Sequence, residues 1–354
     1  VNAELEVEDK LPIHGAIELS NTGTYQTNDW RVQTTLQHVN LTKHDDVLTV
    51  DWITSFDLSD VNAFSAGYFL PVNRDYSLNL FGGISDSDID DVLPQMDIRG
   101  EGYFAGAQLT RTLLEDDRRR VQLSGGWLWQ NLEQENDVGG VQIDERDVTL
   151  SMPTLTLGYA SRVFDRFNGR NFASNTVLAN FAGRFGSSDE EDFDGLADGS
   201  FVVDRFQLAR YQRLFCGPDA PGKFTMFLKV DGQVASEALY SSVRKAVGGA
   251  DSVRGYREQD VSGDDGVTAS IEVRTPLWEN FIPGLKLEEG ADSEAWQQHR
   301  LQLLAFADYG YVRMKDPLPG EFDSDDMFGV GVGTRLTLTK YAQMRLDVGF
   351  PLSH

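Results

Sequence analysis

The sequence of 354 residues contains one cysteine, Cys216, which excludes an internal disulfide and leaves the redox compartment open. No run of about 18 apolar residues occurs, so a transmembrane helix is excluded. Transmembrane strands are not excluded, because alternating strands average to a mild hydropathy. Basic residues are few: 31 Lys and Arg stand against 56 Asp and Glu, a net charge of −25. This charge argues against nucleic acid or an anionic membrane surface as the partner.

Enzyme signatures are also missing. The chain has no G-x-S-x-G, no H-E-x-x-H and no G-x-x-x-x-G-K-[ST] motif. Its five histidines are scattered, so a metal site built from them is a remote prospect. Gly329, Gly331 and Gly333 recur with a strict period of two, which is typical of a strand and not of a nucleotide-binding loop. We therefore expect no enzyme activity, no cofactor and no metal.

Alternation of apolar and polar residues runs through nearly the whole chain and predicts an all-β protein. Near residue 330, Phe328, Val330 and Val332 share one face, and glycines share the other. In a membrane barrel the apolar face meets lipid, whereas a soluble barrel inverts this polarity. Alternation alone does not separate the two, but a polar interior suits a wide barrel. The strand candidates are Ile13–Gly23, Trp30–Asn40, Val47–Asp57, Ala63–Val72, Tyr76–Gly83, Asp97–Thr112, Arg120–Glu133, Asp147–Val163, Phe172–Gly186, Ser200–Phe215, Lys223–Ala235, Val267–Pro276, His299–Met314, Met327–Thr339 and Tyr341–Phe350.

The connections between these fifteen candidates fall into two alternating sets. Long outer loops alternating with short inner turns are typical of an outer-membrane barrel. The acidic residues of the long set most simply serve solvation, and divalent-cation binding is the minority alternative. One long connection, Leu277–Gln298, breaks the pattern on the short-turn side and is expected to hold a small helix around Ala291–Gln298. The long set is Ser85–Met96, Asn136–Arg146, Ser187–Gly199, Ser236–Gly266 and Lys315–Asp326.

The longest non-strand segment, Ser236–Gly266, contains the compact string Val253, Arg254, Gly255 and Tyr256. A segment of this length is usually functional or disordered, and this composition is not a disordered one. Gly255 permits a tight turn, and Tyr256 has a ring that could stack on or bond to the inner wall.

A guanidinium inside a barrel needs carboxylate partners. Because successive side chains alternate between the two faces of a strand, Glu272 and Asp308 are expected to point inward on the two strands after the loop. Gly310 removes a side chain where a returning loop must fit. The alternative is that Arg254 is an ordinary surface arginine, and the four-residue string alone favours that alternative.

Val253–Tyr256 followed by Phe306-x-Asp308-x-Gly310 resembles the paired signatures of the outer-membrane assembly and secretion superfamily. The opening Val7–Gly15, the segment Trp30–Asn40 and the ending Arg345–Leu352 look like its two-partner secretion branch, the haemolysin and filamentous-haemagglutinin exporters. The resemblance implies an antiparallel transmembrane β-barrel of 16 strands, preceded by periplasmic POTRA modules. It also implies that the loop between strands 11 and 12 folds into the lumen, where its arginine contacts Asp308 with Phe306 and Gly310 nearby.

On this reading, residues 1–11 are the tail of a POTRA module or linker, and residues 12–354 are the barrel with its last strand missing. The resemblance implies a monomer in the outer membrane of a Gram-negative bacterium, in contact with lipid and lipopolysaccharide. It would export a secreted exoprotein, unfolded in transit and without nucleotide hydrolysis. The alternatives are an insertase that assembles other barrels and, less favoured, a diffusion porin.

Overall fold

The computed structural model describes residues 11–93, 96–138, 141–193, 195, 197–215, 224–282, 299–317, 320, 322–339 and 341–353. Three predictions therefore lie outside the described residues: the POTRA tail apart from its last residue, Leu11, the helix around Ala291–Gln298, and the turn position of Cys216. The chain forms two compact units. Unit 1 comprises Val1–Arg111, Ser124–Thr154 and Gly183–Ser188, and unit 2 comprises Thr112–Leu123, Leu155–Ala182 and Asp189–His354.

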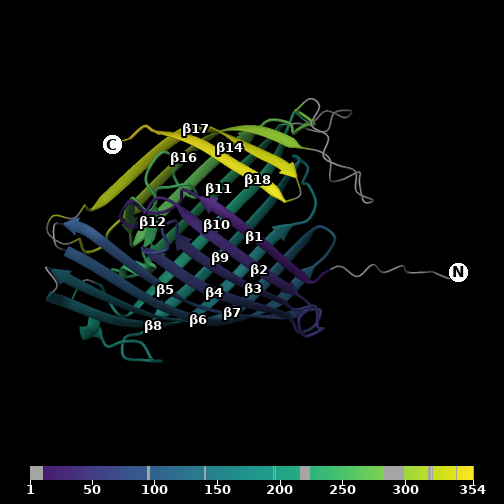
Figure 1. Cartoon of the computed structure of the whole chain (residues 1–354). Helices are drawn as coiled ribbons and strands as arrows, with labels where there is room; N and C mark the ends of the chain where they lie inside the picture. Colours follow the sequence, from purple (N-terminus) through teal and green to yellow (C-terminus); the bar gives the residue numbers. More distant parts are fainter. Residues whose placement is uncertain are drawn as a thin grey trace. The chain divides into compact units, whose positions relative to one another are not determined.

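The prediction of an all-β fold is confirmed, because each of the fifteen candidates corresponds to a strand of one 16-stranded sheet (Figure 1). Neighbours in this sheet follow chain order, and the sixteenth strand, β15 (Trp278–Glu279), pairs with β16 outside that path. No helix among the described residues is long and apolar enough to cross a membrane. The fifteen main strands are β1 (Ile13–Ser20), β2 (Arg31–Val39), β3 (Val47–Ser55), β4 (Val61–Pro71), β5 (Tyr76–Leu93), β6 (Met96–Glu115), β7 (Arg119–Val138), β8 (Val141–Ser161), β9 (Gly169–Asn180), β10 (Phe201–Leu214), β11 (Phe224–Ala235), β14 (Asp265–Arg274), β16 (Arg300–Arg313), β17 (Ser324–Thr339) and β18 (Ala342–Pro351).

Two of the expected loops in unit 1 are strand instead, and the prediction was wrong there. Residues 85–93 belong to β5, and residues 96–115 form β6, so the expected loop Ser85–Met96 is a hairpin end. In the same way β7 continues to Val138, and β8 begins at Val141. Ser and Asp are rare in strands, which made these segments read as loops. An antiparallel ladder needs only backbone pairing and tolerates them, as where Asp88 pairs with Arg99.

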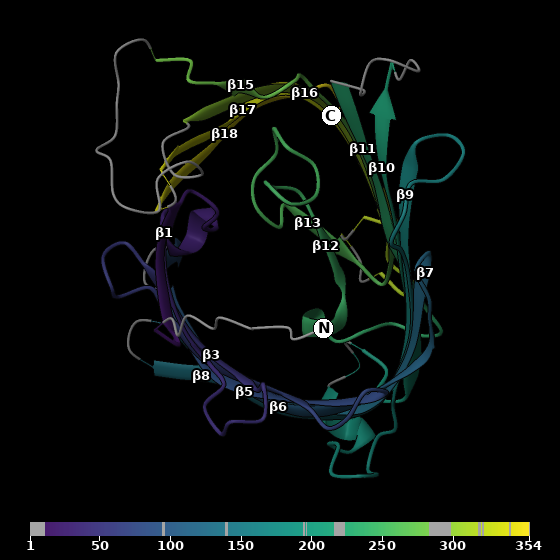
Figure 2. The same cartoon turned by 90° about the vertical axis from the view of Figure 1, so that its right-hand side faces the viewer.

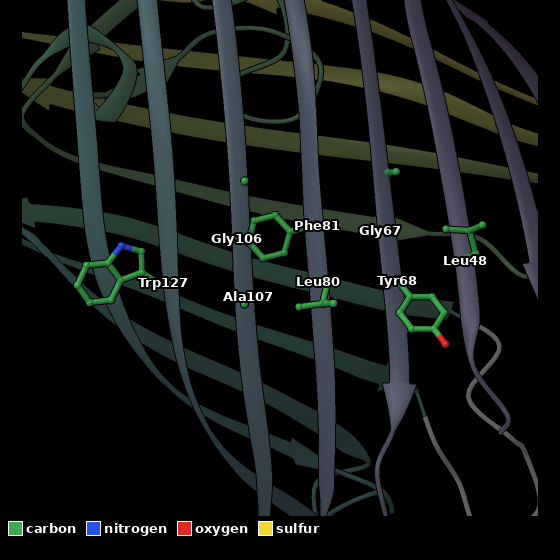
Figure 3. A pocket seen from close by; sticks show the side chains of 10 residues that line it. Leu48, Gly67, Tyr68, Leu80, Phe81, Gly106, Ala107 and Trp127 are labelled. Carbon is green, nitrogen blue, oxygen red and sulfur yellow. The ribbon is translucent and has the colours of Figure 1, made fainter. Parts of the chain in front are cut away.

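The apolar face of unit 1 has a shallow hollow of about 480 Å³ (Figure 3). Leu48, Tyr68, Leu80 and Ala107 lie opposite one another on β3 to β6, so that they form one row across the strands. Small residues deepen the hollow beside this row, and no charged side chain lines it. It is an indentation in an apolar surface, and of the residues that line it only Tyr68 and Trp127 carry a polar side-chain atom, which is too few to orient a specific ligand.

In unit 2 a long connection runs from Ser236 to Asp264 between β11 and β14, and we call it the inner loop. It contains a small antiparallel sheet of β12 (Lys245–Val247) and β13 (Val261–Gly263). Figure 2 shows this sheet lying on the concave side of the strands of unit 2, facing β16 to β18. We call this side the inner face. Four buried side chains, Val247, Val253, Val312 and Met327, fix the loop to it in an apolar cluster.

Candidate functional site

The side chain of Arg254, at the tip of the inner loop, is bound by two carboxylates of the inner face. Its Nε donates to Asp308 Oδ2 at 2.6 Å, and its Nη2 donates to Asp308 Oδ1 at 2.8 Å. Its Nη1 donates to Glu272 Oε1 at 2.6 Å. Asp308 therefore takes the guanidinium in the bidentate fork geometry, which is the strongest arrangement for this pair. The backbone N–H of Arg254 also donates to Asp308 Oδ2, at 3.2 Å.

This cluster is shielded from water. Arg254 is 6% exposed, Asp308 1% and Glu272 7%. The ring of Phe306 lies beneath the guanidinium, with Arg254 Cζ 3.5 Å from the ring centroid. Ser270 Oγ donates to Asp308 Oδ1 at 2.6 Å and so satisfies a further lone pair of that carboxylate. Phe306 thus supplies a cation–π contact in a place where no water competes.

The three carboxylates around Arg254 do not depend on it equally. Glu272 also binds Arg274, whose Nη2 lies 2.5 Å from Glu272 Oε2. The third carboxylate, Asp347, lies 3.7 Å from Arg254 Nη1 and is bound by Arg335 at 2.6 Å and Arg345 at 2.9 Å.

Among the described residues, Asp308 has Arg254 as its single cationic partner. Loss of Arg254 would therefore strand a buried charge at Asp308 and leave the other two carboxylates paired.

The charge of Arg254 persists in this setting. Burial alone would lower the pKa of Arg254, but the hydrogen bonds and negative charge of Asp308 and Glu272 outweigh it and raise the pKa above its ordinary value. The guanidinium therefore keeps its positive charge, and we call the arrangement a permanent ion cluster. Its role is to hold the inner loop on the inner face by ion pairs and hydrogen bonds.

Glycines of the inner face make room for the loop tip. A Cβ on Gly329 would lie 2.2 Å from the carbonyl oxygen of Arg254, and one on Gly349 would lie 2.5 Å from the nitrogen of Gly255. A Cβ on Gly310 would lie 2.4 Å from Val247 Cγ1. Gly255 itself has φ +107°, a conformation that other residues rarely adopt. The backbone of the tip therefore rests directly on the backbones of β17 and β18, and the side chains of Val247 and Val253 lie over Gly310 of β16.

The residues on either side of the arginine hold the tip as well. Val253 is fully buried in the apolar cluster. The hydroxyl of Tyr256 donates to the carbonyl of Ser353 at 2.5 Å and accepts from the backbone N–H of the same residue at 3.2 Å. Tyr256 therefore ties the loop to the segment after β18.

Further bonds hold the base of the inner loop. Asp264 is fully buried and accepts the backbone N–H groups of Leu239 and Lys315, each at 2.8 Å. Lys245 of β12 forms an ion pair with Asp231 of β11. Arg205 of β10 donates to the carbonyl of Val243 at 2.9 Å. The loop is thus fixed at its base, along its small sheet and at its tip.

The structure brings all the sequence-predicted site residues together: Val253, Arg254, Gly255, Tyr256, Glu272, Phe306, Asp308 and Gly310. Asp347 also belongs to this ion cluster and was not predicted from the sequence. The alternation of side chains along β18 indicates its position, because Asp347 is two residues before Gly349 and shares its face. No group of three or more residues suited to hold a metal ion occurs in the part of the chain that the structure describes.

Residues 2–336 match the model of the haemolysin secretion/activation protein family ShlB/FhaC/HecB. Among curated proteins, the chain is 22% identical over 322 residues to the heme/hemopexin transporter protein HuxB of Haemophilus influenzae, covering 88% of this chain and 50% of the relative. The chain therefore spans about half the length of this relative.

Solved structures share the fold. CdiB from Escherichia coli matches with a TM-score of 0.80 at 18% identity, over 98% of this chain and 60% of that one. CdiB from Acinetobacter baumannii matches with a TM-score of 0.73 at 17% identity, over 97% and 57%. BamA from Haemophilus ducreyi, lacking POTRA domains 1–3, matches with a TM-score of 0.60 at 13% identity, over 98% and 68%. These likenesses show that the chain has the antiparallel β-barrel fold of outer-membrane proteins, as predicted.

We expect Gly329→Val to displace the loop tip, because its Cβ would overlap the carbonyl oxygen of Arg254. Overpacking of this kind costs about 1–3 kcal/mol or more. Hydrogen exchange of the amides of Val253–Tyr256 should accelerate in the variant. Gly67→Val is the matched control, because nothing lies within 4 Å of a Cβ added there. Unchanged exchange in Gly329→Val would contradict the close fit.

Proposed function

Because the chain belongs to the haemolysin secretion/activation family ShlB/FhaC/HecB, we propose that it exports a large partner protein, unfolded, from the periplasm to the cell surface. The observation that carries this proposal is the inner loop, which lies on the inner face and is clasped at Arg254 by Asp308 and Glu272. A plain diffusion pore needs no such buried ion cluster. The family match favours export over the assembly of other barrels.

Export of this kind needs no enzyme chemistry in the barrel. The site holds a permanent ion cluster, and its role is to keep the inner loop docked while the polypeptide passes beside it. Folding of the partner outside the cell biases the movement outward, so nucleotide hydrolysis is not required. In this proposal the protein works as a monomer surrounded by outer-membrane lipid and lipopolysaccharide, and its substrate is the exoprotein.

Arg254→Ala should reduce export strongly while the barrel still inserts. The change leaves the buried carboxylate of Asp308 without a cation, which costs roughly 3–5 kcal/mol and releases the loop tip. The measurement is the amount of a co-expressed exoprotein that reaches the medium.

Arg257→Ala serves as the control for that experiment. It removes one positive charge from an exposed position of the same loop and should leave export unchanged. Normal export by Arg254→Ala would contradict an anchoring role of this side chain. Equal loss of export in both variants would assign the effect to the charge of the loop and not to the ion pairs of Arg254.

A disulfide can test whether the loop stays docked during passage. A Cβ on Gly310 would lie 3.7 Å from the Cβ of Val247, which is the usual separation across a disulfide. In a Cys216→Ser background, the pair Val247→Cys and Gly310→Cys should therefore cross-link the loop to β16. We expect the oxidised protein to export at the rate of its reduced form. Export that returns only on reduction would show that the loop must leave the wall.

A further inference from the structure

Two arginines near the short-turn ends of β9 and β10 point to the inner face. Arg205 of β10 reaches the carbonyl of Val243 in the inner loop, which identifies the inward side of that strand. Tyr211 and Arg213 follow at even spacings from Arg205 and share its side. Arg170 of β9 lies opposite Tyr211 in the ladder and therefore shares it as well.

Both guanidiniums contact one phenyl ring. Arg213 Cζ is 3.7 Å and Arg170 Cζ is 4.3 Å from the centroid of the Phe164 ring. Both arginines are exposed, and no carboxylate of the described residues lies within ion-pair distance of either. The ring shields one face of each guanidinium and leaves its N–H edge open to an oxygen ligand.

The turn that carries Phe164 is held firmly. The carboxylate of Asp165 binds Arg210 of β10 at 2.8 and 3.3 Å. The same carboxylate accepts the backbone N–H groups of Phe167 and Gly169, both at 2.9 Å. A fixed turn keeps the phenyl ring and its two arginines in place before a ligand arrives, which lowers the entropy cost of binding.

We propose that Phe164, Arg170 and Arg213 form a docking site for a carboxylate-rich segment of the exported polypeptide. This inference rests on the proposed function. The short turns of an outer-membrane barrel lie on the periplasmic side, so the site lies where the polypeptide enters. An unfolded segment presents Asp and Glu carboxylates, which guanidiniums bind bidentately. A lipid phosphate is the less suitable ligand, because parity puts the two arginines on the face away from lipid.

Binding can be measured on the purified chain in lipid nanodiscs, with a fluorescent, flexible Gly/Ser/Glu peptide and a matched peptide carrying Gln for Glu. We expect the Glu peptide to bind more tightly and to weaken as salt rises. The double variant Arg170→Gln with Arg213→Gln should weaken its binding roughly tenfold. Arg166→Gln is the matched control, because Arg166 belongs to the same turn but stacks on Phe167 at 4.5 Å.

Equal binding of the two peptides, no effect of the double variant, or an equal effect of Arg166→Gln would each overturn the inference. Displacement of the Glu peptide by vesicles of anionic phospholipid would also overturn it and assign the site to lipid. Export in cells separates this inference from the proposed function. Failure of the wild type to export, with peptide binding intact, would count against export alone. Normal export by the double variant would count against the docking site alone.

Discussion

In unit 2 the position of the inner loop depends on one interaction, the binding of the buried guanidinium of Arg254 by carboxylates of the inner face. Arg254 cannot lose its proton, and its removal from water must be offset by ion pairs and hydrogen bonds. Asp308 supplies both oxygens, Glu272 supplies one, and Phe306 covers the guanidinium from below. Glu272 of β14 lies directly opposite Phe306 of β16, and Asp308 follows two residues later on β16. The strands must therefore keep their pairing if the cluster is to form.

The ion cluster works together with close backbone packing. Gly329 and Gly349 let the loop tip approach the wall at distances that any side chain would block. The base of the loop is fixed separately, through Asp264 and through the ion pair of Lys245 with Asp231. A loop held at several levels behaves as part of the wall, and its release would need many bonds to break together. This supports the proposal that the exported polypeptide passes beside a docked loop.

Much of the fold and of this site could be predicted from the sequence, because both rest on a period of two. Parity alone puts Glu272 and Asp308 on the inner face, and the long connection marks the segment that returns to it. The same alternation puts Asp347 on the inner face, but Asp347 was not predicted as a site residue because no motif lies near it. The hairpin end beyond Ser85 could not be predicted as strand, because strand propensity reports side-chain packing, whereas the pairing of β5 with β6 uses the backbone. The contact of Phe164 with Arg170 and Arg213 could not be predicted, because it depends on the path of a turn.

A double-mutant cycle on Arg254→Gln and Asp308→Asn tests the central claim most directly, with the free energy of unfolding of the chain in lipid as the readout. We expect each single change to destabilise the chain by roughly 3–5 kcal/mol and the double change to cost much less than their sum, with a coupling above about 2 kcal/mol. Effects that add within about 0.5 kcal/mol would show that the two side chains do not depend on each other and would contradict the account.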